Sequence, residues 1–347
     1  MKIGMIAPFA YPIPPEFYGG SEQVVYYLTE GLVKKGHDVT LFCQKGSKTH
    51  AKQDDCFSRK PIGGLLNEKN IFPLLQRINY IVGKSSEFDL IHNHSGYLIL
   101  NFSDYLAAPM VTTLHNAYSP EMIDNEIATE LFSNNKFVSI SKSQQRNLKG
   151  VKYIANVYNG TVDLNRYQLG SGGEYLIWIG RFCDAKGTKE AIEIAKKSGN
   201  KLLLAAKENP EDQEYFDKYV KKEIDNKSII FVGEIGIEKK NKLLGKAKAF
   251  LMPINWDEPF GLVMIESMAC GTPVIAYDRG SVPEIIKNGE TGFIVKYGDI
   301  DGMVKAINKV DQIDRRVCRE HVAENFSIEK MVDGYEDVYK KIISEQK

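Results

Sequence analysis

Two carboxylates, Glu258 and Glu266, stand eight residues apart around a turn and an otherwise apolar run. Pro259 suits the first position of a helix, so the pattern predicts a helix from about Phe260 to Cys270 that ends at a glycine. This helix would bury four apolar side chains: Leu262, Val263, Ile265 and Met268. Glu258 would stand at the mouth of this helix, and Glu266 would lie roughly two turns inside it. A buried carboxylate is costly unless it is paired or hydrogen-bonded. A sugar diol would suit Glu266, because one carboxylate can accept from both hydroxyls.

A basic pair offers a second kind of chemistry. Arg181 and Lys186 follow an apolar stretch, on a loop that leads into a predicted helix. The planar fork of an arginine and the compact charge of a lysine could together grip a diphosphate. The loop is not a Walker A motif, because its lysine precedes Gly187 instead of following it. Two surface charges on a loop are the alternative interpretation.

Two further candidates also follow apolar stretches. Gly19 and Gly20 open a predicted helix, where backbone N–H groups can approach an anion. The alternative there is an ordinary turn with Ser21 as the N-cap. His115 ends an apolar run, which would turn its ring toward a ligand cleft. The alternative for His115 is a structural histidine that is hydrogen-bonded to backbone.

The sequence does not predict a metal site. His92 and His94 follow a strand, but no Asp, Glu or Cys with clear ligand spacing joins them. Asp299 and Asp301 form an Asp-x-Asp pair, which we interpret as the start of a helix over 303–309, because an acid there complements the helix dipole. We therefore expect no metal cofactor.

Composition narrows the class of protein. The 347 residues suggest two domains, and the 45 basic and 45 acidic residues balance, so nothing global points to nucleic acid as a partner. Five cysteines without a Cys-x-x-Cys pair favour a reducing compartment. No signal peptide or membrane-spanning run is predicted, which indicates a cytoplasmic protein. One basic run is interpreted as solvated helix faces, with a peripheral contact to the inner membrane face as the alternative: Lys239, Lys240, Lys242, Lys246 and Lys248.

Apolar bursts of strand length alternate with amphipathic stretches, which predicts an α/β protein with parallel sheets covered on both faces. The expected strands cover residues 2–7, 38–42, 90–92, 110–114, 137–140 and 152–157, and then 175–180, 201–206, 229–232, 250–252 and 273–276. Expected helices cover 20–35, 188–198 and 328–343, besides those already given. The last of these would carry four apolar side chains on one face: Met331, Tyr335, Val338 and Tyr339. We read residues 166–174 as a linker. This rhythm predicts two doubly wound, Rossmann-like domains, 1–165 and 166–327, that face each other across a ligand cleft, with a helix at about 328–347 packing back onto the first.

In this order, the motifs resemble those of the family 4 retaining glycosyltransferases of the GT-B fold, also called glycosyl transferases group 1. The resemblance covers essentially the whole chain. Two positions depart from the family pattern: Ser281 replaces a glycine, and Ser267 stands where alanine is frequent. The similarity rests on Gly19-Gly20, His115, Asn159-Gly160 with Asp163, Arg181 with Lys186, Glu258 with Glu266, Gly280 to Ile285, and Thr291 to Phe293.

The resemblance implies a hexosyltransferase that moves a hexose from a nucleoside-diphosphate sugar to an acceptor hydroxyl. It further implies retention of the anomeric configuration and no need for a metal. By the same resemblance, the domain at 1–165 would lie on the acceptor side, and the domain at 166–327 would bind the nucleotide sugar. UDP-sugar is the first expectation for the donor and GDP-mannose the second, and the acceptor would be a glycan, a glycolipid or a small molecule. The alternatives are a nucleotide-sugar epimerase and a catalytically inactive nucleotide-sugar-binding protein.

The resemblance also assigns residues to roles. The catalytic positions would be Arg181, Lys186, Glu258 and His115. Donor binding would involve Gly19, Gly20, Gly233, Glu234, Ile235, Phe260, Gly261, Leu262, Val263 and Glu266.

Overall fold

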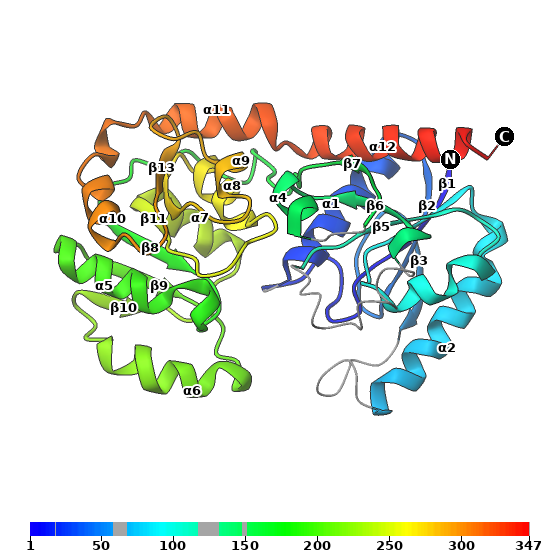
Figure 1. The fold of residues 1–347 in the computed structure, drawn as a ribbon, viewed down its shortest axis with the longest axis horizontal. Coiled ribbons are helices and arrows are strands. Elements are labelled where there is room, and N and C mark those ends of the chain that lie inside the picture. The colour runs from blue at the N-terminus through cyan, green and yellow to red at the C-terminus, as the bar shows by residue number, and fades with distance from the viewer. Residues whose placement is uncertain (18, 58–67, 117–131, 148–150, 347) are drawn as a thin grey trace. The chain divides into compact units, whose positions relative to one another are not determined.

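The computed structural model describes residues 1–17, 19–57, 68–116, 132–147 and 151–346 (Figure 1). The chain divides into two compact units. The first unit comprises Met1–Thr161 together with Ile328–Lys347, and the second comprises Val162–Ser327. The division after residue 161 falls four residues before the predicted boundary at 165. Each unit is described by itself.

The first unit is built on a parallel sheet of seven described strands in the order β3-β2-β1-β4-β5-β6-β7. The inner strands are apolar because the sheet is covered on both faces; Ile3, Met5 and Ile6 of β1, for example, are fully buried. The strands are β1 (Lys2–Ile6), β2 (Asp38–Gln44), β3 (Lys52–Phe57), β4 (Leu90–Asn93), β5 (Met110–Thr113), β6 (Lys136–Ser139) and β7 (Tyr153–Asn156). The helices are α1 (Gly20–Lys34), α2 (Glu68–Lys84), α4 (Lys142–Asn147) and α12 (Ile328–Ser344).

The second unit repeats this plan with six described strands in the order β10-β9-β8-β11-β12-β13, all parallel. Its strands are β8 (Tyr175–Ile179), β9 (Leu202–Ala205), β10 (Ile229–Phe231), β11 (Ala247–Met252), β12 (Val274–Tyr277) and β13 (Gly292–Val295). Its helices are α5 (Thr188–Ser198), α6 (Gln213–Tyr215), α7 (Ile237–Lys246), α8 (Leu262–Ala269), α9 (Val282–Ile285), α10 (Ile300–Ile307) and α11 (Arg315–Asn325).

The predicted fold class, two doubly wound α/β units, is confirmed, and every predicted strand is present with shifts of a few residues. Sequence analysis did not predict the edge strands β3 and β13 or the helices α2, α7 and α11. β3 begins Lys52-Gln-Asp-Asp, and a polar strand at the edge of a sheet lacks the apolar run that marks a central strand. The expected linker 166–174 packs tightly instead: Gly170 N–H donates to Cys270 O at 3.0 Å, and Gly172 N–H donates to Gly245 O at 2.9 Å.

The helix predicted at 328–343 is α12, and its predicted apolar face is buried. This face lies in the first unit, where α12 contacts α1 (Figure 1). The four predicted members of the face are at most 5% exposed: Met331, Tyr335, Val338 and Tyr339.

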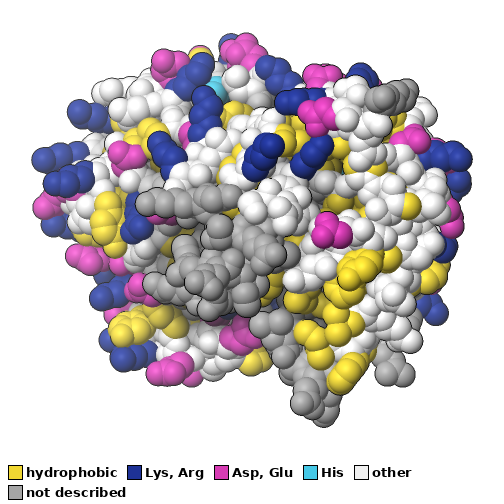
Figure 2. Space-filling model, turned by 45° about the vertical axis from the view of Figure 1, so that its right-hand side comes forward, with side chains coloured by type: hydrophobic (Ala, Val, Ile, Leu, Met, Phe, Trp, Pro, Cys, Tyr) yellow, Lys and Arg dark blue, Asp and Glu magenta, His cyan; other side chains and the backbone are white. Residues whose placement is uncertain are grey.

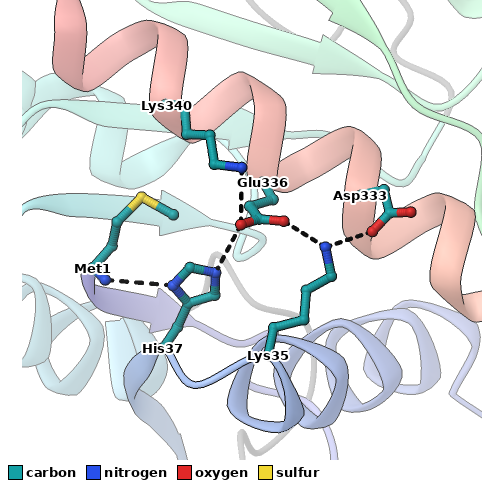
Figure 3. A network of polar contacts seen from close by, with 6 residues as sticks. All are labelled: Met1, Lys35, His37, Asp333, Glu336 and Lys340. Carbon is teal, nitrogen blue, oxygen red and sulfur yellow. Dashed lines mark hydrogen bonds and ion pairs between the residues drawn. The ribbon is translucent and has the colours of Figure 1, made fainter.

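A polar network joins α12 to the end of α1 (Figure 3). Lys35 pairs with Asp333 at 2.5 Å and also with Glu336. Glu336 further pairs with Lys340 at 3.0 Å and lies 3.4 Å from His37. Hydrogen bonds from Lys35 and Lys340 lower the pKa of the Glu336 carboxyl to about 2. Ion pairs therefore hold the polar side of α12 to the end of α1, while the apolar face of α12 is buried in the core of the first unit.

Surface features agree with the balanced composition. Lysine and arginine side chains are interspersed with aspartate and glutamate on the face drawn in Figure 2. In the described ranges, no helix combines the length and apolar character needed to cross a bilayer. The cysteines whose side chains are described are all free: Cys43, Cys183, Cys270 and Cys318.

The contact between α1 and α12 depends on a glycine. A Cβ atom at Gly31 would lie 2.4 Å from Cγ2 of the buried Val332, whereas a Cβ at Gly83 in α2 would meet nothing within 4 Å. We predict that Gly31→Ala lowers the free energy of unfolding by about 1–3 kcal/mol, because it overpacks this contact. Gly83→Ala, the matched control, should raise it by up to about 1 kcal/mol through helix propensity.

Urea denaturation of both variants measures the difference. Val332→Ala should reduce the cost of Gly31→Ala in the double variant, since the two residues touch. Equal stability of the two alanine variants would contradict the proposed role of Gly31.

Candidate active site

Lys186 and Glu258 meet because β8 and β11 are neighbours in the sheet. The strand order reverses between β8 and β11, and ligands bind beyond the carboxyl ends of strands at such a point. Arg181 and Lys186 follow β8, and Glu258 follows β11. Residues 72 positions apart in sequence are thereby brought to one edge of the sheet.

The two loops that carry these residues are pressed together. Gly187 has a φ of +67°, and a Cβ there would lie only 1.7 Å from Pro253 O. Asn255 N–H donates to Ala185 O at 2.9 Å, and its side-chain amide donates to Asp184 O at 2.9 Å. These contacts leave no room for a larger side chain at residue 187.

Lys186 and Glu258 form an ion pair at 2.6 Å. Trp256 completes this group: its indole N–H donates to Glu258 Oε2 at 3.1 Å, and Lys186 Nζ lies 4.5 Å from the centroid of its ring. Cation–π attraction and the ion pair therefore hold the ammonium from two sides. Sequence analysis missed Trp256, although a tryptophan two residues before the acid was visible in Trp256-Asp-Glu258.

Arg181 is oriented by a carboxylate that sequence analysis also missed. Its Nε and Nη2 donate to the two oxygens of Asp212 at 2.9 and 2.7 Å, which is a fork-to-fork contact. Asp212 is only 6% exposed, and the hydrogen bond from Arg181 is the main cause of its lowered pKa, followed by that from Asn209. Arg181 itself keeps 36% of its side chain exposed. The guanidinium is thus held in place but is not enclosed.

The loop around Glu258 is held by Gly280 and Ser281. Gly280 has a φ of +56°, and a Cβ there would lie 2.4 Å from both the N and the O of Glu258. Ser281 N–H donates to Glu258 O at 2.9 Å, and its buried hydroxyl donates to Phe260 O at 2.8 Å. The departure from the family pattern at Ser281 therefore supplies a hydrogen bond that glycine cannot make.

The helix after Glu258 differs from the prediction. α8 begins at Leu262, with Gly261 as N-cap at a φ of +76°, so Pro259 lies outside it and was wrongly placed at its first position. A left-handed residue cannot continue a right-handed helix, which is why α8 begins only after Gly261. Glu266 is consequently the fifth residue of α8, not two turns inside it.

Because α8 starts later than predicted, its first two residues are less buried than predicted. Ile265 and Met268 are buried as predicted, but Leu262 and Val263 are half-buried, which corrects the prediction for both. The expected end at a glycine is confirmed, since Gly271 has a φ of +75° and its N–H donates to Met268 O at 2.8 Å.

Glu266 is 4% exposed and has two partners from the protein. Tyr167 O–H donates to its Oε1 at 3.1 Å, and Lys240 Nζ donates to the same oxygen. Interpreting Lys240 as part of a solvated helix face was therefore wrong, because only 13% of its side chain is exposed. Lys248, from the same run, lies in β11 and pairs with Asp311 at 2.9 Å.

The loop Gly233-Glu234-Ile235 follows β10 and leads into α7, the helix that carries Lys240. Gly233 has a φ of +74°, which glycine tolerates best. Glu234 is exposed, and Ile235 is half-buried.

The remaining candidates lie in the first unit. Gly19, at a φ of +148°, is the N-cap of α1, so the alternative that made Ser21 the N-cap is wrong. A Cβ at Gly19 would lie 2.8 Å from Pro15 Cβ and 3.1 Å from Glu22 Oε2. Burial raises the pKa of the Glu22 carboxyl to about 7. The backbone at Gly19-Gly20 therefore lies close to a carboxyl group that burial favours in its neutral form.

His115 lies two residues beyond β5, and among the described residues its ring contacts another histidine and no backbone group. Its Nε2 lies 2.8 Å from His94 Nδ1, and His94 Nε2 lies 3.2 Å from His92 Nδ1. His92 continues the chain to Tyr339 of α12 at 2.6 Å. Burial lowers the pKa of His115 to about 4, which keeps its ring neutral near pH 7.

The Asp-x-Asp pair caps a helix, as predicted. Asp299 is the N-cap of α10 and accepts a hydrogen bond from Gly302 N–H at 2.8 Å. α10 spans Ile300–Ile307, so it starts three residues earlier than predicted. Within the described parts of the chain, no three or more His, Cys, Asp or Glu residues are grouped to hold a metal ion.

Comparison with known proteins identifies the class. The family model described as Glycosyl transferases group 1 matches residues 162–325, and the one described as Glycosyltransferase Family 4 matches residues 18–161. N-acetyl-alpha-D-glucosaminyl L-malate synthase of Bacillus anthracis is 28% identical over 304 residues, which cover 77% of this chain and 78% of that protein. Glycogen synthase of Mycobacterium tuberculosis is 22% identical over 98% of this chain and 94% of its own.

Solved structures show the same fold. Sucrose-phosphate synthase from Thermosynechococcus elongatus superposes with a TM-score of 0.79 at 20% identity, covering 99% of this chain and 100% of that one. Anabaena HepE in complex with UDP-glucose superposes with a TM-score of 0.76 at 20% identity, covering 98% and 100%. Two parallel-sheet units of this kind are the GT-B fold. The chain belongs to the family 4 glycosyltransferases, the glycosyl transferases group 1.

The contact between Gly280 and Glu258 leads to a prediction. Gly280→Ala should lower transferase turnover by about 100-fold, because displacing a catalytic loop by about 1 Å can cost that much. Gly289→Ala is the matched control: Gly289 also has a positive φ, +83°, but a Cβ there meets nothing within 4 Å. Gly289→Ala should lower the stability of the protein and leave its turnover unchanged.

Steady-state kinetics of both variants at a temperature where both are folded gives the comparison. Similar turnover of the two variants would show that the close contact at Glu258 does not matter for activity.

Proposed function

We propose that this protein is a retaining, metal-independent hexosyltransferase that uses a nucleoside-diphosphate sugar. The observation that carries the proposal is the ion pair of Lys186 with Glu258 at the carboxyl ends of β8 and β11, with Arg181 on the loop that also carries Lys186. UDP-sugar is our first choice of donor and GDP-mannose the second. The structural neighbour HepE, which was solved with UDP-glucose, supports this order.

The difficult step in such a reaction is departure of the nucleoside diphosphate, which gains negative charge as the sugar becomes oxocarbenium-like. Fixed positive groups aimed at that charge stabilise the transition state. At an effective dielectric of about 20, a unit charge at 4 Å contributes roughly 4 kcal/mol. A helix terminus contributes about 0.3–2 kcal/mol. Arg181 and Lys186 should therefore outweigh the dipole of α8, since each 1.36 kcal/mol changes the rate about tenfold.

The contacts of the basic pair suit this role. Asp212 orients the guanidinium of Arg181 through two hydrogen bonds, so little order is lost when an anion binds. Glu258 accepts a hydrogen bond from Lys186 at 2.6 Å. We propose that Lys186 turns to the diphosphate when donor binds, while Trp256 keeps its hydrogen bond to Glu258 and leaves that carboxylate to accept from the hexose.

Other residues would bind the rest of the donor. In this proposal Glu266 accepts from the ribose hydroxyls, and the loop at Gly233-Glu234-Ile235 lies against the base. Backbone N–H groups at the start of α8 face the sugar and phosphate, with half-buried Val263 near the ribose. The N–H groups at Gly19-Gly20 position the phosphates.

The acceptor side of the proposal rests on His115, which would hydrogen-bond the hexose or the acceptor through its neutral ring. The departing phosphate would take the proton of the acceptor hydroxyl. The acceptor would be a glycan, a glycolipid or a small molecule. We propose that the protein acts in the cytoplasm, with a peripheral contact to the inner membrane face as the alternative.

A thermal-shift panel of UDP, GDP, ADP and their common sugars tests the proposed donor. A ligand at 100 times its dissociation constant should stabilise the protein by about 2.7 kcal/mol. We expect UDP and one UDP-sugar to raise the melting temperature most. If none of the nucleotides changes the melting temperature, the proposed function is wrong.

Chelation tests metal independence. We expect turnover with the donor found in that panel to persist in excess EDTA, because Arg181 and Lys186 would supply the positive charge. Loss of turnover in EDTA and its recovery with Mg²⁺ or Mn²⁺ would refute the metal-free mechanism.

We further predict that Arg181→Ala or Lys186→Ala lowers turnover by about two to three orders of magnitude, in line with about 4 kcal/mol per charge. Lys222→Ala, which removes an exposed lysine of the same unit, should leave turnover unchanged. Circular dichroism should show that all three variants are folded. Near-normal turnover in both site variants would remove the proposed leaving-group role.

A further inference from the structure

We propose that Lys240 and Tyr167 are positioning residues that hold one oxygen of Glu266 and reserve the other for the ribose diol of the donor. This inference deepens the proposed function and rests on it. Neither residue belongs to the motifs that the sequence analysis assigned to the site.

The protein fills only part of the hydrogen-bond acceptor positions of the Glu266 carboxylate. A carboxylate has about four acceptor positions, two on each oxygen. Tyr167 O–H and Lys240 Nζ both donate to Oε1, which uses the two positions of that oxygen. Among the described residues, none donates to Oε2. Two acceptor positions are therefore left on one oxygen, which is what the two hydroxyls of a cis-diol require.

Burial explains why the charge of Lys240 is needed. Only 5% of the Glu266 side chain and 13% of the Lys240 side chain are exposed. A carboxylate this deep in a protein needs a partner of opposite charge, because desolvation penalises it otherwise. A ribose placed over Glu266 removes the remaining water, and the ammonium of Lys240 then stays as the compensating charge.

Tyr167 is itself held against α8. Arg319 Nη1 donates to Tyr167 O at 2.5 Å and to Ala269 O, at the end of α8, at 2.6 Å. The phenol ring is 1% exposed. Its hydroxyl therefore approaches Oε1 from a fixed direction, and Glu266 cannot turn Oε1 outward without breaking this hydrogen bond.

Lys240 connects the carboxylate to the loop proposed for the base. α7 starts at Ile237, just after Gly233-Glu234-Ile235, and Lys240 lies in its first turns. The proposed contacts to the base and to the ribose thus come from neighbouring parts of the chain, the loop before α7 and the start of α7. Lys240 and Tyr167 should therefore make the protein bind a ribonucleotide more tightly than its 2′,3′-dideoxy analogue, whatever the base.

The experiment compares the dissociation constants of UDP and 2′,3′-dideoxy-UDP by calorimetry, or those of the matching pair for whichever base binds best. The wild-type protein should prefer the ribonucleotide clearly. We expect Lys240→Met to reduce this preference by at least tenfold through weaker ribonucleotide binding, with dideoxy binding little changed. Tyr167→Phe removes only a hydroxyl, so it should fold and reduce the preference by a smaller factor.

Lys242→Met is the matched control, because Lys242 is an exposed lysine on the same helix, and it should keep the full preference. A merely structural role would weaken both nucleotides equally in the Lys240 and Tyr167 variants, and that result would overturn the inference. An undiminished preference in Tyr167→Phe and Lys240→Met would overturn it as well. Failure of the wild-type protein to bind any of UDP, GDP and ADP would instead refute the proposed function itself.

Discussion

The adjacency of β8 and β11 is the constraint on which the candidate site depends. Because these parallel strands are neighbours at the reversal of strand order, the loops that follow them must share one edge of the sheet. The close approach of Gly187 to Pro253 then fixes the distance between the loops, and the pair Lys186–Glu258 follows from it. A basic loop and an acidic loop that are far apart in sequence become one polar group.

Carboxylates recur as the partners of this site's cations. Asp212 holds Arg181, Glu258 holds Lys186, and Glu266 accepts from Lys240. Each pair keeps a charged group in place in a half-buried or buried position, where an unpaired charge would be costly. The carboxylates of the second unit thus determine where its cationic side chains lie.

The sequence allowed prediction of the central strands, the paired glutamates and the basic loop, because apolar runs and local motifs are contiguous. It did not allow prediction of β3, since a polar edge strand has no apolar run. Asp212, Trp256 and Lys240 were missed as site residues, because their importance comes from tertiary contacts alone. The start of α8 was misplaced because the proline signal was followed although Gly261 takes a left-handed conformation.

The return of α12 to the first unit has a consequence for synthesis on the ribosome. The first unit buries Met331, Tyr335 and Tyr339 of α12, which leave the exit tunnel after every strand of the second unit. The core of the first unit thus stays incomplete until α12 has emerged. The amino-terminal half of this enzyme must therefore complete its fold last, although it is made first.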